Sequence, residues 1–92
     1  MAKASQLFLM TREWALATDD HQWILQKRVG GVWQDQRFVR SKAGIVRCME
    51  RDGVRPFKSA QRALDALPET WRDWVSSVGA HYRPPARPRL LH

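Results

Sequence analysis

The pattern of apolar and polar positions between residues 12 and 39 predicts β-strands. Apolar side chains alternate with polar ones along residues 12–18, 22–29 and 32–39, and a period of two residues is typical of a strand with one buried face. The alternation is imperfect, because both faces of the second run carry an apolar residue. A shift of one residue exchanges the two faces, so the pattern leaves open which face meets the core.

Two turn signals join these strands. Asp19-Asp20-His21 follows the first strand, and aspartate side chains favour turns because they accept hydrogen bonds from nearby backbone N–H groups. Gly30-Gly31 follows the second strand, and adjacent glycines adopt the positive φ angles that a tight hairpin requires. The sequence therefore predicts a three-stranded antiparallel β-meander.

A helix is predicted after the third strand, over about Lys42 to Asp52. Its apolar residues recur at spacings of three and four residues, which places them on one stripe of a helix. Ser41 is a suitable N-cap, because its hydroxyl can accept a hydrogen bond from an N–H group of the first turn. Gly53 suits the left-handed conformation that commonly follows the last helical residue.

Two further helical segments are predicted before the tail. Ser59 is a candidate N-cap for a helix over residues 60–67, and an apolar stripe containing Trp71 and Trp74 predicts a helix over residues 69–78. Pro68 lies between them, and proline is favoured in the first turn of a helix but interrupts a helix interior. The pattern indicates either two short helices or one helix that is kinked at Pro68.

These elements predict a small α+β domain in which two or three short helices pack on one face of the meander. Residues 1–10 are expected to be flexible or partly paired, residues 11–80 to form the single α+β domain, and residues 81–92 to form a disordered basic tail rich in proline and arginine. The length of 92 residues is that of one domain, and the composition of the tail cannot bury a core.

Large side chains must supply much of the core of so short a chain. The five tryptophans each bury roughly 200 Å², so we expect core positions for them, notably for Trp71 and Trp74, with an exposed binding surface as the alternative. Phe57 is expected to insert into the core from a connector. Cys48 lies on the apolar stripe of its helix and is expected to be a buried, unreactive thiol.

The net charge of +7 is concentrated in the middle of the chain and in the tail. Residues 27–58 hold nine basic and three acidic side chains, and such a balance favours acidic partners. The candidate binding residues are Lys27, Arg28, Arg37, Arg40, Arg47, Arg51, Arg55 and Lys58. Aromatic residues alternate with these cations, which is typical of nucleic-acid binding; the alternative is an aromatic core with a solvated arginine rim.

Catalytic and metal sites are not predicted. The available nucleophile and bases are Cys48 with His21 or His81, and nothing in their positions indicates the convergence that nucleophilic catalysis requires. Asp19, Asp20 and His21 are consecutive, and consecutive residues rarely converge on one metal ion. We therefore expect a non-enzymatic protein without a metal or a cofactor.

The expected location is the cytoplasm, with no membrane contact. No apolar run approaches the roughly 20 residues of a membrane-spanning helix, and the first residues lack the features of a signal peptide. Cys48 is the single cysteine, so no intramolecular disulfide can form, as is typical of proteins in a reducing compartment.

The chain resembles small uncharacterised proteins of phage and prophage early regions. The resemblance rests on the order W-A-L-A-T-D-D-H-Q-W-I-L-Q-K, a hairpin, F-V-R-S-K with a helix, and A-L-D-A-L-P-E-T-W-R-D-W, and it covers about Trp14 to Trp74. It implies an accessory protein of a mobile element in a bacterial host. Such proteins bind nucleic acid or inhibit a host machine, as anti-CRISPR inhibitors of nucleoprotein complexes do.

Two functions are therefore expected as alternatives. The first is a basic module that binds DNA, RNA or a nucleoprotein, with an affinity that falls steeply with salt. The second is a protein-binding inhibitor that docks on an acidic protein surface and binds little free nucleic acid. A homodimer formed through a free strand edge is possible in either case.

Overall fold

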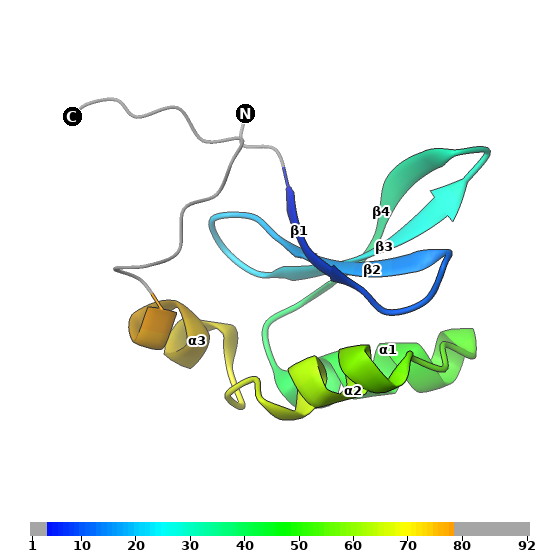
Figure 1. Cartoon of the computed structure of the whole chain (residues 1–92). Helices are drawn as coiled ribbons and strands as arrows, with labels where there is room; N and C mark the ends of the chain where they lie inside the picture. The colour runs from blue at the N-terminus through cyan, green and yellow to red at the C-terminus, as the bar shows by residue number, and fades with distance from the viewer. Residues whose placement is uncertain (1–3, 79–92) are drawn as a thin grey trace.

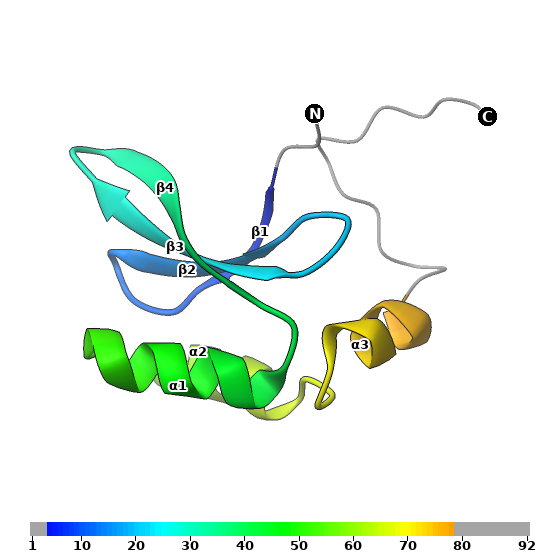
Figure 2. The same cartoon turned by 180° about the vertical axis from the view of Figure 1, so that it is seen from behind.

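A computed structural model of the chain describes residues 4–78, which form a four-stranded antiparallel sheet and three helices (Figure 1). The strands are β1 (Ser5–Leu9), β2 (Trp14–Thr18), β3 (Trp23–Val29) and β4 (Val32–Val39), and they pair in the order β1-β2-β3-β4. The helices are α1 (Lys42–Asp52), α2 (Lys58–Asp65) and α3 (Trp71–Val78). Helices α1 and α2 run side by side beneath one face of the sheet, and α3 lies at one end (Figures 1 and 2). The α+β class is confirmed.

The predicted number of strands is wrong, because residues 5–9, within the segment expected to be flexible or partly paired, form a fourth strand, β1. β1 pairs with β2 from Ser5 to Leu9, and the register shifts between Gln6 and Phe8. This bulge places an extra residue in β1, so Leu7 and Phe8 both pack against the core although they are adjacent. The bulge removes the alternation that would have identified the strand. The predicted tail at residues 81–92 lies outside the described residues.

Both predicted turns are confirmed. Gly30 and Gly31 have φ angles of 59° and 80°, and positive values at both central positions are typical of the two-residue hairpin turn that matches strand twist. In the other turn, Asp19 Oδ1 accepts hydrogen bonds from the backbone N–H groups of His21 at 2.7 Å and Gln22 at 3.0 Å. The two turns thereby set the lengths of β2, β3 and β4.

The structure confirms α1 with its predicted ends. The Gly44 N–H donates to Ser41 Oγ at 2.9 Å, so Ser41 caps the first turn. Gly53 has a φ angle of 68°, and its N–H is directed to the carbonyl oxygens of the last turn. Both signals depend only on neighbouring residues, which is why the sequence was sufficient here.

The predicted start of α2 is wrong. The helix begins at Lys58, and the capping position is Phe57, which makes no side-chain capping bond. The Phe57 N–H instead donates to the Met10 carbonyl at 2.8 Å, and this link to the end of β1 fixes the start of α2. The helix ends at Asp65, so residues 58–78 hold two separate helices rather than one helix kinked at Pro68.

The helices cover the sheet face that carries Leu16, Trp23 and Leu25, all of which are 0% exposed. Ile45 of α1 and Leu64 of α2 pack against this face, so the face that the sequence left open is now assigned. Further core residues are Met10, Met49, Val54 and Ala60.

Two expected core positions differ from prediction. Phe57 is 47% exposed, whereas the nearby Val54 is buried and fills the core in its place. Cys48 is half-buried at the margin of the core rather than enclosed by it.

The tryptophans differ in how far they are buried. Trp23 is enclosed, and its ring centroid lies 6.1 Å from that of Trp74 in a tilted arrangement. Trp14, Trp71 and Trp74 are partly buried against the core. The predicted core role of Trp71 and Trp74 is thus consistent with their packing.

The opposite face of the sheet, here called the open face, has no helix upon it (Figure 2). The strand register places on it Leu9, Ala15, Ala17, Ile24, Gln26, Asp35 and Phe38. Gln6 Nε2 donates to Gln26 Oε1 at 3.0 Å, and Gln26 Nε2 donates to Asp35 Oδ1 at 2.9 Å. These two hydrogen bonds link β1, β3 and β4 across the open face and give the buried Gln26 side chain a partner for both its oxygen and its nitrogen.

Thr18 connects the sheet to α3, so Thr18→Val is expected to lower the free energy of unfolding by about 1–3 kcal/mol. The buried Thr18 Oγ1 accepts from Trp71 Nε1 at 2.9 Å and donates to the Gln22 carbonyl at 2.9 Å. Valine keeps the shape but leaves the indole N–H without its acceptor. Urea unfolding measures the change, with the exposed Ser76→Ala as control. Equal stability of the two variants would show that the bond contributes nothing.

Candidate nucleic-acid interface

The eight predicted binding residues do not converge on one site. They are distributed over β3 (Lys27, Arg28), β4 (Arg37), the β4–α1 connection (Arg40), α1 (Arg47, Arg51), the α1–α2 connection (Arg55) and α2 (Lys58). Their environments differ, and the differences separate structural cations from those that are available to a partner.

Arg37 is held by a carboxylate. Its Nε donates to Asp52 Oδ2 at 3.1 Å, and its Nη2 donates to Asp52 Oδ1 at 2.9 Å. The two-pronged hydrogen bond and the charge of Arg37 lower the pKa of Asp52 below its usual value, and the same contact raises the pKa of Arg37. Since the pair joins β4 to the last turn of α1, the geometry gives Arg37 a structural role.

Stability is expected to fall in acid through this pair. The folded-state pKa of Asp52 is below the ordinary value of 3.8, so the contribution is complete above about pH 5 and is lost as the pH falls through the folded-state pKa. Asp52→Asn should therefore destabilise the protein at pH 7 and lose most of that difference at pH 2. Urea unfolding at the two pH values measures this, with the exposed Glu69→Gln as control. A difference for Asp52→Asn that is the same at both pH values would contradict the assignment.

Lys27 and Arg28 lie against aromatic rings. Lys27 Nζ is 5.7 Å from the centroid of the Trp14 ring, and the guanidinium carbon of Arg28 is 5.9 Å from that of Trp33. These distances are those of cation–π contacts, which leave the N–H groups able to bind an anion. The two cations point to opposite faces of β3, because they are consecutive in a strand.

The two sides of α1 differ in charge. Arg47 and Arg51, here called the arginine ridge, border a groove of about 200 Å³ that is lined by Val39, Gly44 and Cys48. The residues are four apart, so they lie one above the other at about 6 Å along the helix. On the other side of α1, a second groove is lined by two carboxylates, Glu50 and Asp65, and by one cation, Lys42. The positive side of α1 is therefore the side next to β4.

The acidic and basic groups of the described residues rarely meet. Arg37 with Asp52 is the one ion pair found among residues 4–78. Arg47, Arg51 and Arg55 are exposed, and none of them forms an ion pair in that part of the chain, although the charge of Arg51 also helps to lower the pKa of Asp52. Lys42 differs, because its Nζ donates to the carbonyl oxygens of Asp65 and Leu67 and thereby ends α2.

The open face is not strongly basic. Arg28 and Asp35 are charges of opposite sign on it, and Phe38 is 55% exposed. Trp23 belongs to the core on the other side. Aromatic and basic residues that alternate along the sequence thus lie on different surfaces of the fold. Exposed apolar groups lie on the open face, and arginines without an ion pair among residues 4–78 lie on α1.

A second basic feature was not anticipated from the sequence. A cavity of about 380 Å³, here called the basic pocket, is lined by His21, Arg40, Thr70, Trp71 and Arg72. Of these, the sequence singled out Arg40 as a binding residue; His21 and Arg72 come from segments about 50 residues apart. No local motif connects them, because the pocket exists only once α3 docks beside the sheet.

None of the helices within residues 4–78 is long and apolar enough to cross a membrane. In comparisons with protein-family models, curated proteins and solved structures, nothing matches this chain, and its resemblance to phage and prophage accessory proteins stays a prediction.

Proposed function

We propose that this chain is a non-enzymatic basic binding module that engages nucleic acid, and that the arginine ridge is the centre of its contact. The observation that carries the proposal is the separation of charge on α1. Arg47 and Arg51 lie beside β4 and form no ion pair among residues 4–78, whereas both carboxylates that line a groove of α1, Glu50 and Asp65, belong to the other groove. Arg40 and Arg55, before and after α1, extend the cationic surface at both ends.

The chemistry of this surface favours the phosphate backbone over the bases. Exposed arginines bind phosphate oxygens with paired N–H groups, and neutralising phosphates releases counterions, which gives affinity without sequence preference. The helix beside β4 carries no Asn or Gln, the side chains that pair with the edge of adenine. We therefore expect recognition of shape and charge, in agreement with a role as an accessory protein of a phage or other mobile element.

A fluorescence-anisotropy titration tests the proposal. Labelled single- and double-stranded DNA and RNA are titrated with the full chain at low and at physiological salt. Binding that persists at physiological salt and weakens linearly with the logarithm of salt concentration supports the proposal. Binding restricted to low salt would indicate unspecific attraction of a chain with a net charge of +7 and would overturn it.

A protein-binding inhibitor, including an anti-CRISPR or other anti-defence role, is the second candidate. It is favoured by the open face, on which Leu9 and Phe38 are 46% and 55% exposed without a helix above them. Exposed apolar groups bordered by polar ones are typical of protein interfaces. This candidate predicts a stoichiometric protein complex that is lost in Phe38→Asp while nucleic-acid binding stays weak.

A further inference from the structure

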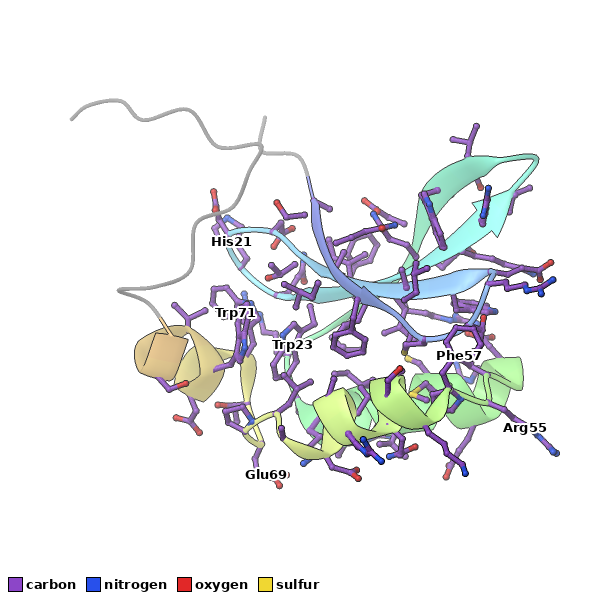
Figure 3. The ribbon with its side chains drawn as sticks, viewed as in Figure 1. His21, Trp23, Arg55, Phe57, Glu69 and Trp71 are labelled. Carbon is purple, nitrogen blue, oxygen red and sulfur yellow. The ribbon has the colours of Figure 1, made fainter. Side chains whose placement is uncertain are left out.

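The basic pocket brings together three segments that are distant in the sequence. His21 belongs to the β2–β3 turn, Arg40 follows β4, and Thr70, Trp71 and Arg72 begin α3. Figure 3 shows His21 and Trp71 at the same end of the molecule, where α3 approaches the sheet. The pocket therefore lies between the sheet and α3, near the N-terminal end of α1 (Figure 3).

Hydrogen bonds hold the walls of the pocket in place. The Trp71 N–H donates to the Arg40 carbonyl at 2.8 Å, and the Lys42 N–H donates to the Glu69 carbonyl at 2.8 Å. Between them, Ser41 and Thr70 form an antiparallel bridge. The Trp71 indole is fixed separately by its bond to Thr18. These bonds hold the segment that carries Arg40 against the segment that carries Arg72, so the distance between the two backbone segments is fixed.

The charged side chains of residues 4–78 that line the pocket are two arginines. Arg40 and Arg72 supply two guanidinium groups, neither of which forms an ion pair among residues 4–78, and His21 supplies an imidazole whose ring N–H can donate a hydrogen bond. The nearby carboxylate of Asp19 accepts hydrogen bonds from its own turn and from Gln22 Nε2. The pocket thus has a surplus of hydrogen-bond donors.

The hydrogen-bond donors available in the pocket belong to side chains and not to the backbone N–H groups at the start of α3. At the start of α3, the Trp71 N–H bonds to the Arg40 carbonyl, the Asp73 N–H to Thr70 Oγ1, and the Trp74 N–H to the Thr70 carbonyl. These backbone donors are therefore occupied. Thr70 Oγ1 accepts one bond and still has its own hydroxyl proton to donate.

The size of the pocket exceeds that of a bare anion. A volume of about 380 Å³ lies within the range of small-ligand sites, roughly 300–1,000 Å³. The Trp71 ring supplies an apolar wall against which a flat or cyclic group can pack. A nucleotide satisfies both features, because its phosphate is attached to a sugar that carries a flat base.

We propose that the basic pocket binds one nucleotide, with its phosphate held by Arg40 and Arg72 and its sugar or base against Trp71. The proposal rests on the proposed function in one respect, since the nucleotide can belong to a nucleic-acid strand bound along the arginine ridge. A free mononucleotide offers the same chemistry, and the experiment separates the two sources.

The test titrates the full chain with adenosine monophosphate, with adenosine and with inorganic phosphate, while the indole N–H signals of the tryptophans are followed by NMR. We expect the Trp71 signal to shift with the monophosphate, and adenosine to bind about tenfold more weakly or worse, because a charge-assisted hydrogen bond is lost. Absence of a Trp71 shift, or equal binding of adenosine, would overturn the proposal.

Variants localise the site. Arg40→Gln with Arg72→Gln should weaken monophosphate binding about tenfold or more, whereas Arg12→Gln with Arg62→Gln removes the same charge from exposed positions outside the pocket and should retain it. Equal affinity of the two double variants would overturn the proposal. If the first double variant is unfolded by circular dichroism, Arg72→Gln alone is compared with Arg62→Gln under the same criterion.

Competition identifies the source of the nucleotide. Displacement of the monophosphate by a short oligonucleotide shows that the pocket takes a nucleotide of a strand, and a requirement for its 5′-phosphate shows that this nucleotide is the end. A bound monophosphate that no oligonucleotide displaces supports a free nucleotide and removes the pocket from strand binding. If the chain binds a nucleic-acid strand but no monophosphate, the proposed nucleotide site in the basic pocket is wrong and the proposed function stands. If the chain binds the monophosphate but no strand, the proposed function is wrong and the nucleotide site stands.

Discussion

Trp23→Ala is expected to lower the free energy of unfolding by about 3–5 kcal/mol, the usual cost of removing an enclosed aromatic side chain. Trp23 is 0% exposed, lies at the start of β3 on the helix-covered face and packs beside Trp74. Domains of this size are stable by only about 5–15 kcal/mol, so the variant loses a large part of its stability. Thermal unfolding followed by circular dichroism should show a midpoint lower by about 15–30 °C.

Two further variants sharpen this prediction. Phe38→Ala removes another large aromatic group from a position that is 55% exposed, and it should change the stability by about 0.5 kcal/mol or less. Trp23→Phe keeps most of the ring and removes an indole N–H that is buried without a partner among the described residues, so it should cost less than Trp23→Ala. Similar losses for Trp23→Ala and Phe38→Ala would contradict the assignment of the core to the helix-covered face.

Reversing the charge of the arginine ridge is expected to have the largest effect on binding. Arg47→Glu with Arg51→Glu replaces two exposed cations on the positive side of α1. The loss of two phosphate contacts should reduce the salt dependence of log K by about 2, and the new carboxylates repel the strand. The affinity for DNA or RNA should fall by about a hundredfold at physiological salt, since each charge-assisted contact is worth about 1.5 kcal/mol or more.

Net charge alone must be excluded as the cause. Arg12→Glu with Arg62→Glu changes the net charge by the same amount at exposed positions of the β1–β2 connection and α2. If the ridge is the contact, this control retains most of the affinity and its salt dependence. Equal losses in both double variants would show that the strand is attracted by the overall charge without a defined contact.

Sequence reasoning succeeded where the determining interactions are local. The ends of α1 follow from Ser41 and Gly53, and the hairpin between β3 and β4 follows from two glycines with positive φ. Sequence reasoning failed where an element or its boundary depends on a residue far away in the chain. Residues 1–10 were predicted to be flexible or partly paired and not a full strand, because the bulge of β1 breaks the alternation. The start of α2 was misplaced because the Met10 carbonyl accepts the hydrogen bond of the Phe57 N–H.

The candidate site shows the same limit. The positive charge of the middle of the chain could be read from composition, but composition does not show which cations are occupied. Arg37 is engaged by Asp52, 15 residues away, whereas the ridge has no such partner in residues 4–78. The basic pocket joins His21 to Arg72, and no periodicity or spacing relates positions so far apart.

The order of the strands has a kinetic consequence. In the sheet order β1-β2-β3-β4, every strand pairs with its neighbour in the chain, so each pairing closes a short loop and costs little chain entropy. Topologies of this kind have a low contact order and fold quickly. The contacts between α3 and the sheet, such as Trp71 with Thr18, span far more of the chain. Docking of α3 thus costs more chain entropy than the pairing of any two neighbouring strands, and the basic pocket is complete only when α3 has docked.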